Sequence, residues 1–90
     1  MEEDSKFVLT VGSRYRIVSM ELKDKPLITH GTFKGYTSIG HDDAVVVEMD
    51  SNHKDLEGRT RVIPCGMIMS IDVVEVVKEE KKRVPEGMYV

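Results

Sequence analysis

The sequence predicts an all-β domain, a small and strongly bent antiparallel barrel of about five strands. Residues 30–37 and 44–48 are rich in strand-forming residues, and turn-forming residues at 38–43 separate them. In the first stretch Phe33 lies two residues from both Gly31 and Gly35, so one extended strand places all three on the same face. A glycine inside a strand marks a sharp bend or a close backbone approach, which a small barrel requires.

Composition sets the broad class of protein. Ninety residues, of which 40% are hydrophobic and 32% charged, fit one soluble globular domain. The net charge of −3 argues against binding through bulk positive charge and leaves room for a local basic patch. A single cysteine, Cys65, makes no internal disulfide, which agrees with a reducing compartment. With an acidic start and no apolar run of about 20 residues, we expect a cytoplasmic protein with no membrane contact.

The first half of the chain predicts two strands joined by a short turn. Residues 1–6 read as a flexible acidic arm, and residues 7–11 as a short strand or a single helical turn against the core. Residues 14–23 alternate so that Tyr15, Ile17 and Ser19 share one face. Residues 23–26 form a polar turn in which Pro26 interrupts the ladder, and residues 27–37 form the second strand.

The second half predicts three shorter strands and a charged tail. We expect strands at 44–49, 59–63 and 68–77, with a long polar loop at 50–58 and a tight reversal at 64–66. Val45 and Val47 face inward in the first of these strands, and Ile71, Val73 and Val77 share a face of the last. Residues 7–77 therefore form the barrel. Residues 78–90 are a charged tail, which is either solvated or docks on a neighbour through residues 88–90.

The glycine and aromatic pattern resembles that of the Sm-like (LSm) family of small RNA-associated β-barrels, over residues 11–77. The pattern is Gly-Thr-Phe-Lys-Gly-Tyr at 31–36, and residues 43–46 stand where the family has the sequence Asn-Leu-Val-Leu. Residues 63–66 echo the family's second motif, an apolar residue followed by Arg-Gly. The resemblance implies a barrel that assembles into a ring and associates with RNA.

The chain departs from this family at the positions that hold a flipped base. Thr37, Asp43 and Cys65 stand where the family has aspartate, asparagine and arginine. The Thr37 hydroxyl can still donate or accept a hydrogen bond, whereas Asp43 adds a negative charge and Cys65 lacks the guanidinium. We expect a divergent member that lacks the usual base pocket. SH3-like barrels have similar strand lengths and are the alternative fold family.

Several other residues are candidates for RNA contact. His41 lies in the expected base-binding loop and can stack on a base, and Arg61 lies on the fourth strand where it meets either phosphate or solvent. Tyr36 either packs at the barrel rim or stacks on a base. The candidate RNA-binding residues are thus Tyr36, Thr37, His41, Asp43, Arg61, Cys65 and Gly66.

No pattern points to catalysis. Asp42 and Asp43 read as a turn, and no motif supplies a base for Cys65. His30, His41 and His53 lack metal-ligand spacing, so we expect neither a metal nor a cofactor. The first hypothesis is a non-catalytic Sm-like protein that binds RNA and forms a homo-oligomer through its edge strands. The second is an SH3-like module that binds a protein partner and no RNA.

Overall fold

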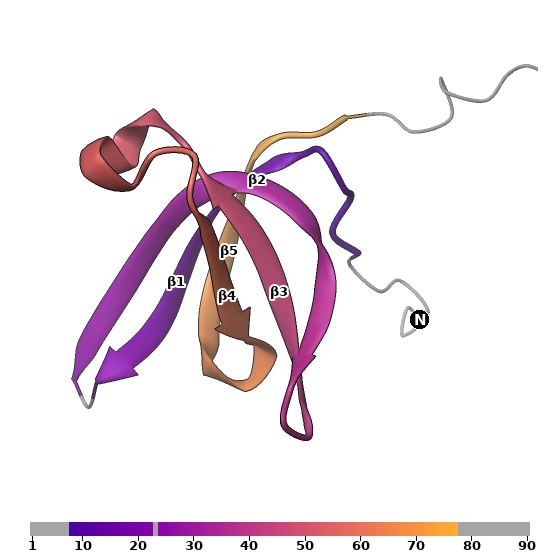
Figure 1. The fold of residues 1–90 in the computed structure, drawn as a ribbon, viewed down its shortest axis with the longest axis vertical. Coiled ribbons are helices and arrows are strands. Elements are labelled where there is room, and N and C mark those ends of the chain that lie inside the picture. Colours follow the sequence, from indigo (N-terminus) through magenta and orange to yellow (C-terminus); the bar gives the residue numbers. More distant parts are fainter. Residues whose placement is uncertain (1–7, 23, 78–90) are drawn as a thin grey trace, which may run out of the picture.

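A computed structural model of the chain describes residues 8–22 and 24–77 (Figure 1). Its five strands form one antiparallel sheet in the order β4-β3-β2-β1-β5, which confirms the all-β class and the five antiparallel strands. The predicted arm at 1–6 and the predicted tail at 78–90 lie outside the described residues. The strands are β1 (Arg14–Leu22), β2 (Lys25–Ile39), β3 (Asp42–Met49), β4 (Thr60–Pro64) and β5 (Ile68–Glu75), with 3-10 helices η2 (Ser51–Leu56) and η3 (Cys65–Met67).

The long strand β2 gives the sheet its curvature. It arches over the molecule and connects the part of the sheet near β1 with the part near β3 (Figure 1). Phe33 pairs with Val47 and Gly35 with Val46, so a bulge lies between them, and Gly35 adopts a φ of +140° there. The extra residue changes the side on which the following residues lie. The prediction that Phe33 and Gly35 share one face is therefore wrong.

At Gly31 the strands β2 and β3 approach too closely to leave room for a side chain. A Cβ atom at this position would lie 2.2 Å from the carbonyl oxygen of Glu48 and 2.7 Å from Cγ1 of Val47. Only glycine fits such an approach without a shift of the backbone. The close backbone contact expected inside this strand is present at Gly31.

The hydrophobic core lies inside the curved sheet. The face of β1 that carries Tyr15, Ile17 and Ser19 is buried, and so are Val45 and Val47, the predicted inward residues of β3. Phe33 is 1% exposed and belongs to the buried cluster. Its ring meets the ring of Tyr15 edge-on, with centroids 6.3 Å apart. The buried cluster consists of Leu9, Tyr15, Ile17, Phe33, Val45, Val47 and Ile63.

The segment before β1 packs on this core without forming a strand or a helix. Residues 8–10 have no regular structure, so the prediction of a strand or helical turn is wrong, although Leu9 is buried. The Phe33 backbone N–H donates to the Ser13 carbonyl at 2.8 Å, and the Gly12 N–H donates to the Phe33 carbonyl at 2.9 Å. The Ser13 hydroxyl accepts from the Val77 N–H at 2.9 Å, which fixes the end of the described chain beside this segment.

Three further expectations need correction. Pro26 lies within β2 and opposite Met20, because the turn at Asp24 is tight and a proline is tolerated near the start of a strand. The loop expected at 50–58 contains η2, which Asp50 caps by accepting from the Asn52 N–H. The last strand ends at Glu75, and Val73 is 46% exposed because β5 is an edge strand with two register shifts.

The sheet has two free edges. In the described residues β4 pairs with β3 and β5 pairs with β1, and the sheet order has β4 and β5 at its ends. η3 connects the two edge strands in the sequence. Both strands therefore keep one backbone edge that no strand of the sheet occupies.

Candidate functional site: a turn cluster and an edge groove

The register of β2, β3 and β4 gathers most of the predicted RNA-binding residues at one end of the sheet. Thr37 pairs with Ala44, and Ala44 pairs with Pro64, so three adjacent strands place these residues in one row. The neighbouring positions carry the candidate side chains. We call Tyr36, Thr37, Asp43, Cys65 and Gly66 the turn cluster.

Within the turn cluster, the side chains differ in how accessible they are. Tyr36 is 58% exposed, and its ring lies edge-on to Phe33 with centroids 5.1 Å apart. One edge of the tyrosine thus packs on the core while much of the ring faces solvent. Cys65 is half-buried and packs against the hydrophobic core. Its thiol therefore contributes more to packing than to an exposed pocket.

His41 lies beyond the turn cluster, at the turn that joins β2 to β3. Its side chain is exposed, and the hairpin around it carries Asp42 opposite Ile39 and Asp43 opposite Ser38. Two carboxylates in this hairpin make its local charge negative. A base can stack here, but phosphate gains no attraction from these neighbours.

Arg61 lies apart from the turn cluster. It pairs with Val47 near the other end of β4, and its Nη1 atom donates to the Thr29 hydroxyl at 2.8 Å. Thr29 is fully buried, so this bond satisfies a hydroxyl that has no access to water. The contact that Arg61 makes in this structure is therefore a structural one, with Thr29.

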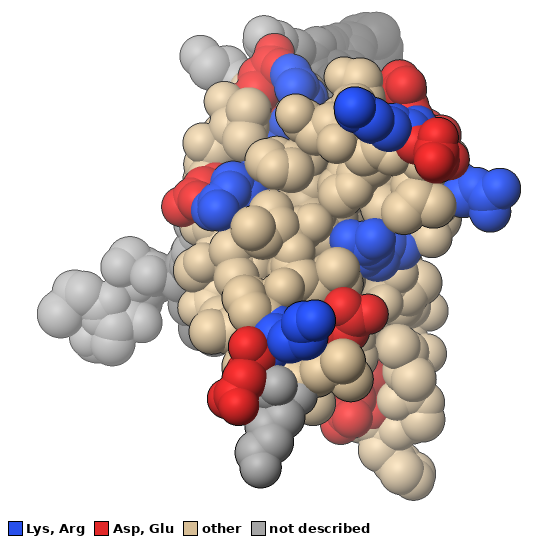
Figure 2. All heavy atoms as spheres, turned by 90° about the vertical axis from the view of Figure 1, so that its left-hand side faces the viewer, with Lys and Arg blue, Asp and Glu red and all other residues tan. Residues whose placement is uncertain are grey.

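Three other cations of the sheet, Arg14, Arg16 and Lys34, are paired with carboxylates. Arg14 lies 3.1 Å from Glu75 and Arg16 lies 2.8 Å from Asp72, both between β1 and β5. Lys34 lies 3.5 Å from Glu48. On the face in Figure 2, acidic and basic side chains are interspersed and a broad uncharged surface separates them. That face offers no continuous basic surface to a nucleic acid.

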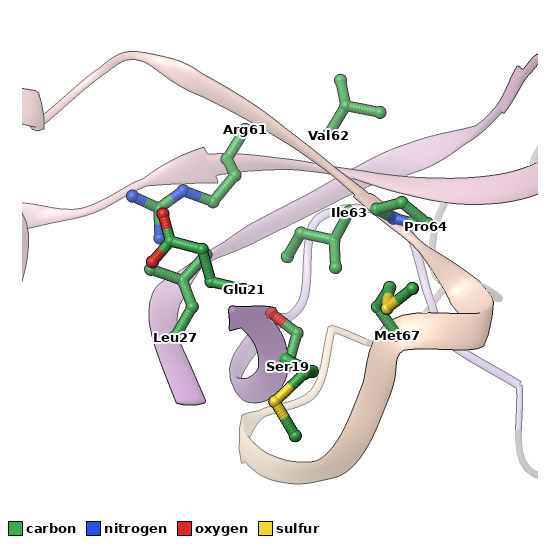
Figure 3. Close-up of a pocket in the computed structure, with 9 residues that line it drawn as sticks. Ser19, Glu21, Leu27, Arg61, Val62, Ile63, Pro64 and Met67 are labelled. Carbon is green, nitrogen blue, oxygen red and sulfur yellow. The ribbon is translucent and has the colours of Figure 1, made fainter. Parts of the chain in front are cut away.

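An apolar groove of about 330 Å³ runs beside the edge strand β4 (Figure 3). Four consecutive residues of β4, from Arg61 to Pro64, line it, so the groove follows the strand's length. Its other walls come from the ends of β1 and β2 and from η3. The lining residues are Ser19, Met20, Glu21, Leu27, Arg61, Val62, Ile63, Pro64 and Met67, which together form the edge groove.

Ser19 places a polar group inside this apolar setting. It is 2% exposed, and its hydroxyl makes no hydrogen bond to any residue that the structure describes. In Figure 3 its oxygen points into the space between Leu27 and Ile63. A buried hydroxyl without a partner is costly, so this atom is available to a group that enters the groove.

Sequence reasoning placed Ser19 on one face with Tyr15 and Ile17 but did not identify it as part of a site. The signal for Ser19 in the sequence is its position, two residues after Ile17 and four after Tyr15, on the same face of the strand. The edge groove itself was missed, because its walls come from four separate segments.

The free edge of β5 carries exposed apolar side chains. Met69 and Val74 are 58% and 53% exposed, and each occupies a register shift against β1. Between them, residues 70–73 pair regularly with residues 15–18 of β1. On the other edge, Val62 of β4 is 42% exposed. Apolar groups on both free edges indicate surfaces that gain stability when they are covered.

Comparisons of the chain with models of protein families, with curated proteins and with solved structures found no match. Within residues 8–22 and 24–77, no helix has the length and apolar character needed to cross a membrane. The same residues contain no group of three or more His, Cys, Asp or Glu side chains that could hold a metal ion. The function must therefore be inferred from the turn cluster, the edge groove and the two free edges.

Proposed function

We propose that this chain is a non-catalytic, Sm-like binding protein that self-associates through its edge strands β4 and β5. The observation that carries the proposal is the edge groove beside β4, together with the exposed apolar side chains on β5. A strand from a second copy satisfies the free backbone groups of β4, and its apolar side chains fill the groove. The barrel is then closed between copies, and a rotation that closes on itself gives a ring.

The geometry limits how long this contact is. Pro64 has no backbone N–H, so it ends the available part of β4. On the other strand, the regular stretch is residues 70–73, because bulges lie on both sides of it. The contact is therefore a short strand pair, and the apolar groups in the groove provide much of its stability. The Ser19 hydroxyl gains a hydrogen-bond partner from the strand that enters.

Replacing Val62 with lysine tests this contact, because it places a charge on the edge of β4 beside the groove. Val62 is 42% exposed in one chain, so the change costs the isolated fold little. We expect self-association to weaken by about tenfold or more, since a charge buried in an apolar contact costs upwards of ~1.4 kcal/mol. Sedimentation velocity over a range of protein concentrations measures the effect.

Val8→Lys is the matched control, because Val8 is 67% exposed and lies outside the sheet. The control variant should associate as the wild type does. Equal association of the wild type and Val62→Lys, with both proteins folded, would contradict the proposed contact.

Contact with RNA is a second candidate function, and the register that gathers the turn cluster favours it. Tyr36 presents an exposed ring beside Thr37, which can hydrogen-bond a base edge. His41 on the adjoining turn offers a second ring for stacking. This site differs from a phosphate-binding surface, because Asp42 and Asp43 lie in the same hairpin.

If RNA stacks on this cluster, Tyr36→Ala should weaken the binding of a short uridine-rich RNA about 5- to 150-fold, the equivalent of about 1–3 kcal/mol for one stacked base. Ile28→Ala is the control, because Ile28 is also an exposed apolar residue of β2 and lies near the opposite end of the strand. Fluorescence anisotropy at about 50 mM and about 200 mM salt separates stacking from phosphate contact. No binding of the wild type at either salt concentration would refute RNA contact and favour a protein partner, as in the SH3-like alternative.

A further inference from the structure

The start of η2 is fastened to β2 through both backbone groups of His30. Pairing between β2 and β3 ends at Gly31 and Met49, so His30, which precedes Gly31 on β2, has no β3 partner. The His30 carbonyl instead accepts from the Asp50 N–H at 3.0 Å. The His30 N–H donates to the imidazole Nε2 atom of His53 at 2.9 Å. A side chain thus takes the place of a strand at this position.

One of these two bonds depends on the protonation state of His53. The Nε2 atom accepts a hydrogen bond only in the neutral ring, with the proton on Nδ1. When Nε2 gains a proton, two N–H groups face each other and the bond is lost. The bond from Asp50 to the His30 carbonyl involves backbone groups alone and does not titrate.

We propose that the hydrogen bond between His30 and His53 is an acid-sensitive latch, which holds η2 on β2 at neutral pH and releases it when His53 is protonated. The proposal concerns the fold of a single chain and is independent of self-association. It assigns a role to two histidines that the proposed binding function does not use.

The surroundings of His53 disfavour its charged form. Burial lowers the pKa of His53 below its usual value of 6.5, and the charges of Arg61 on β4 and His30 on β2 lower it further. The two imidazole rings lie 5.8 Å apart between centroids. Asp50 acts in the opposite direction and raises the pKa of His53.

Asp50 remains ionised over the pH range in which His53 titrates. Burial opposes its ionisation, but hydrogen bonds from Asn52 and the charges of His30 and Arg14 outweigh burial and lower its pKa. Arg14 reaches this site from β1, with Nη2 3.8 Å from the Asp50 carboxylate. On η2 itself, Lys54 and Asp55 are exposed and follow His53 directly. The latch thus titrates through His53, while Asp50 keeps capping η2.

The direction of the pH effect follows from the lowered pKa. Between the folded-state pKa of His53 and the unfolded-state value, the unfolded chain binds more protons than the folded chain. The latch therefore contributes its full stability above about pH 6.5. This contribution is lost as the pH falls through the folded-state pKa.

Hydrogen exchange on the full chain, followed by mass spectrometry, tests the latch at about pH 7.5 and about pH 5. After correction for the intrinsic pH dependence of exchange, protection of peptides that contain residue 30 or residues 51–58 should fall about 2- to 10-fold at the lower pH, as expected for the loss of one hydrogen bond. His53→Gln retains a neutral acceptor and should abolish this pH response. His41→Gln, a change at an exposed histidine on another turn, should retain it.

Equal protection of the wild type at both pH values would overturn the latch, and so would a wild-type response in His53→Gln. Because the readout is local exchange, a chain that is monomeric at every concentration refutes self-association and still reports on the latch.

Discussion

Phe33→Ala is expected to lower the free energy of unfolding by about 3–5 kcal/mol, the usual cost of removing a buried aromatic ring. Phe33 is 1% exposed, and its ring makes T-shaped contacts with the rings of both Tyr15 and Tyr36. The loss is a large part of the stability of a small domain, which is about 5–15 kcal/mol. Urea denaturation followed by circular dichroism measures it.

Ile39→Ala is the control for this loss, because Ile39 belongs to the same strand and is 45% exposed. The control should change the unfolding free energy by about 0.5 kcal/mol or less. An equal, small effect of both substitutions would show that Phe33 is not the centre of the core.

Gly31→Ala should destabilise the fold by about 1–3 kcal/mol or more, although it adds a single methyl group. The new Cβ atom would lie 2.2 Å from the carbonyl oxygen of Glu48, and a backbone atom inside a paired strand cannot move away freely. Relief of the clash requires β2 and β3 to separate at the point where η2 is fastened. Thermal and urea denaturation both report the loss.

Gly66→Ala is the matched control, because a Cβ atom at Gly66 would have no neighbour within 4 Å and the residue does not have a positive φ. Its effect should lie within about 0.5 kcal/mol of zero. If Gly31→Ala proved as mild as Gly66→Ala, the close approach of β2 and β3 would be wrong.

The sequence predicted those parts of the fold that local chemistry determines. Alternation placed Tyr15, Ile17 and Ser19 on one face of β1, and the structure shows that this face is buried. Gly35 was less predictable, because a bulge before it moves the glycine out of register with Phe33. A period of two residues cannot reveal where an extra residue interrupts it.

The candidate site was only partly predictable, for a related reason. The turn cluster could be anticipated, since its residues follow a linear motif, whereas the edge groove brings together segments around residues 20, 27, 62 and 67. The contact of Arg61 was likewise not predictable from the sequence. An alternating arginine on a strand predicts a charged surface, but its bond to the buried Thr29 depends on the way the sheet curls.

His53 was also beyond sequence reasoning. Its spacing from His30 matches no metal motif, and the residues around it predict a polar loop. The loop instead forms η2, and the imidazole fills the place that a β3 residue would occupy beside β2. Contacts of this kind arise because a buried backbone N–H requires a partner, whatever residue supplies it.

Native molar mass tests most directly whether the free edges of β4 and β5 make this chain assemble with itself. Light scattering behind a sizing column, on the full chain at moderate salt and without ligand, gives the mass independently of shape. Self-association predicts a mass several times that of one 10.2 kDa chain. The mass of a single chain, maintained as the protein concentration is raised, would contradict self-association and direct the search to a different protein partner for the edge groove.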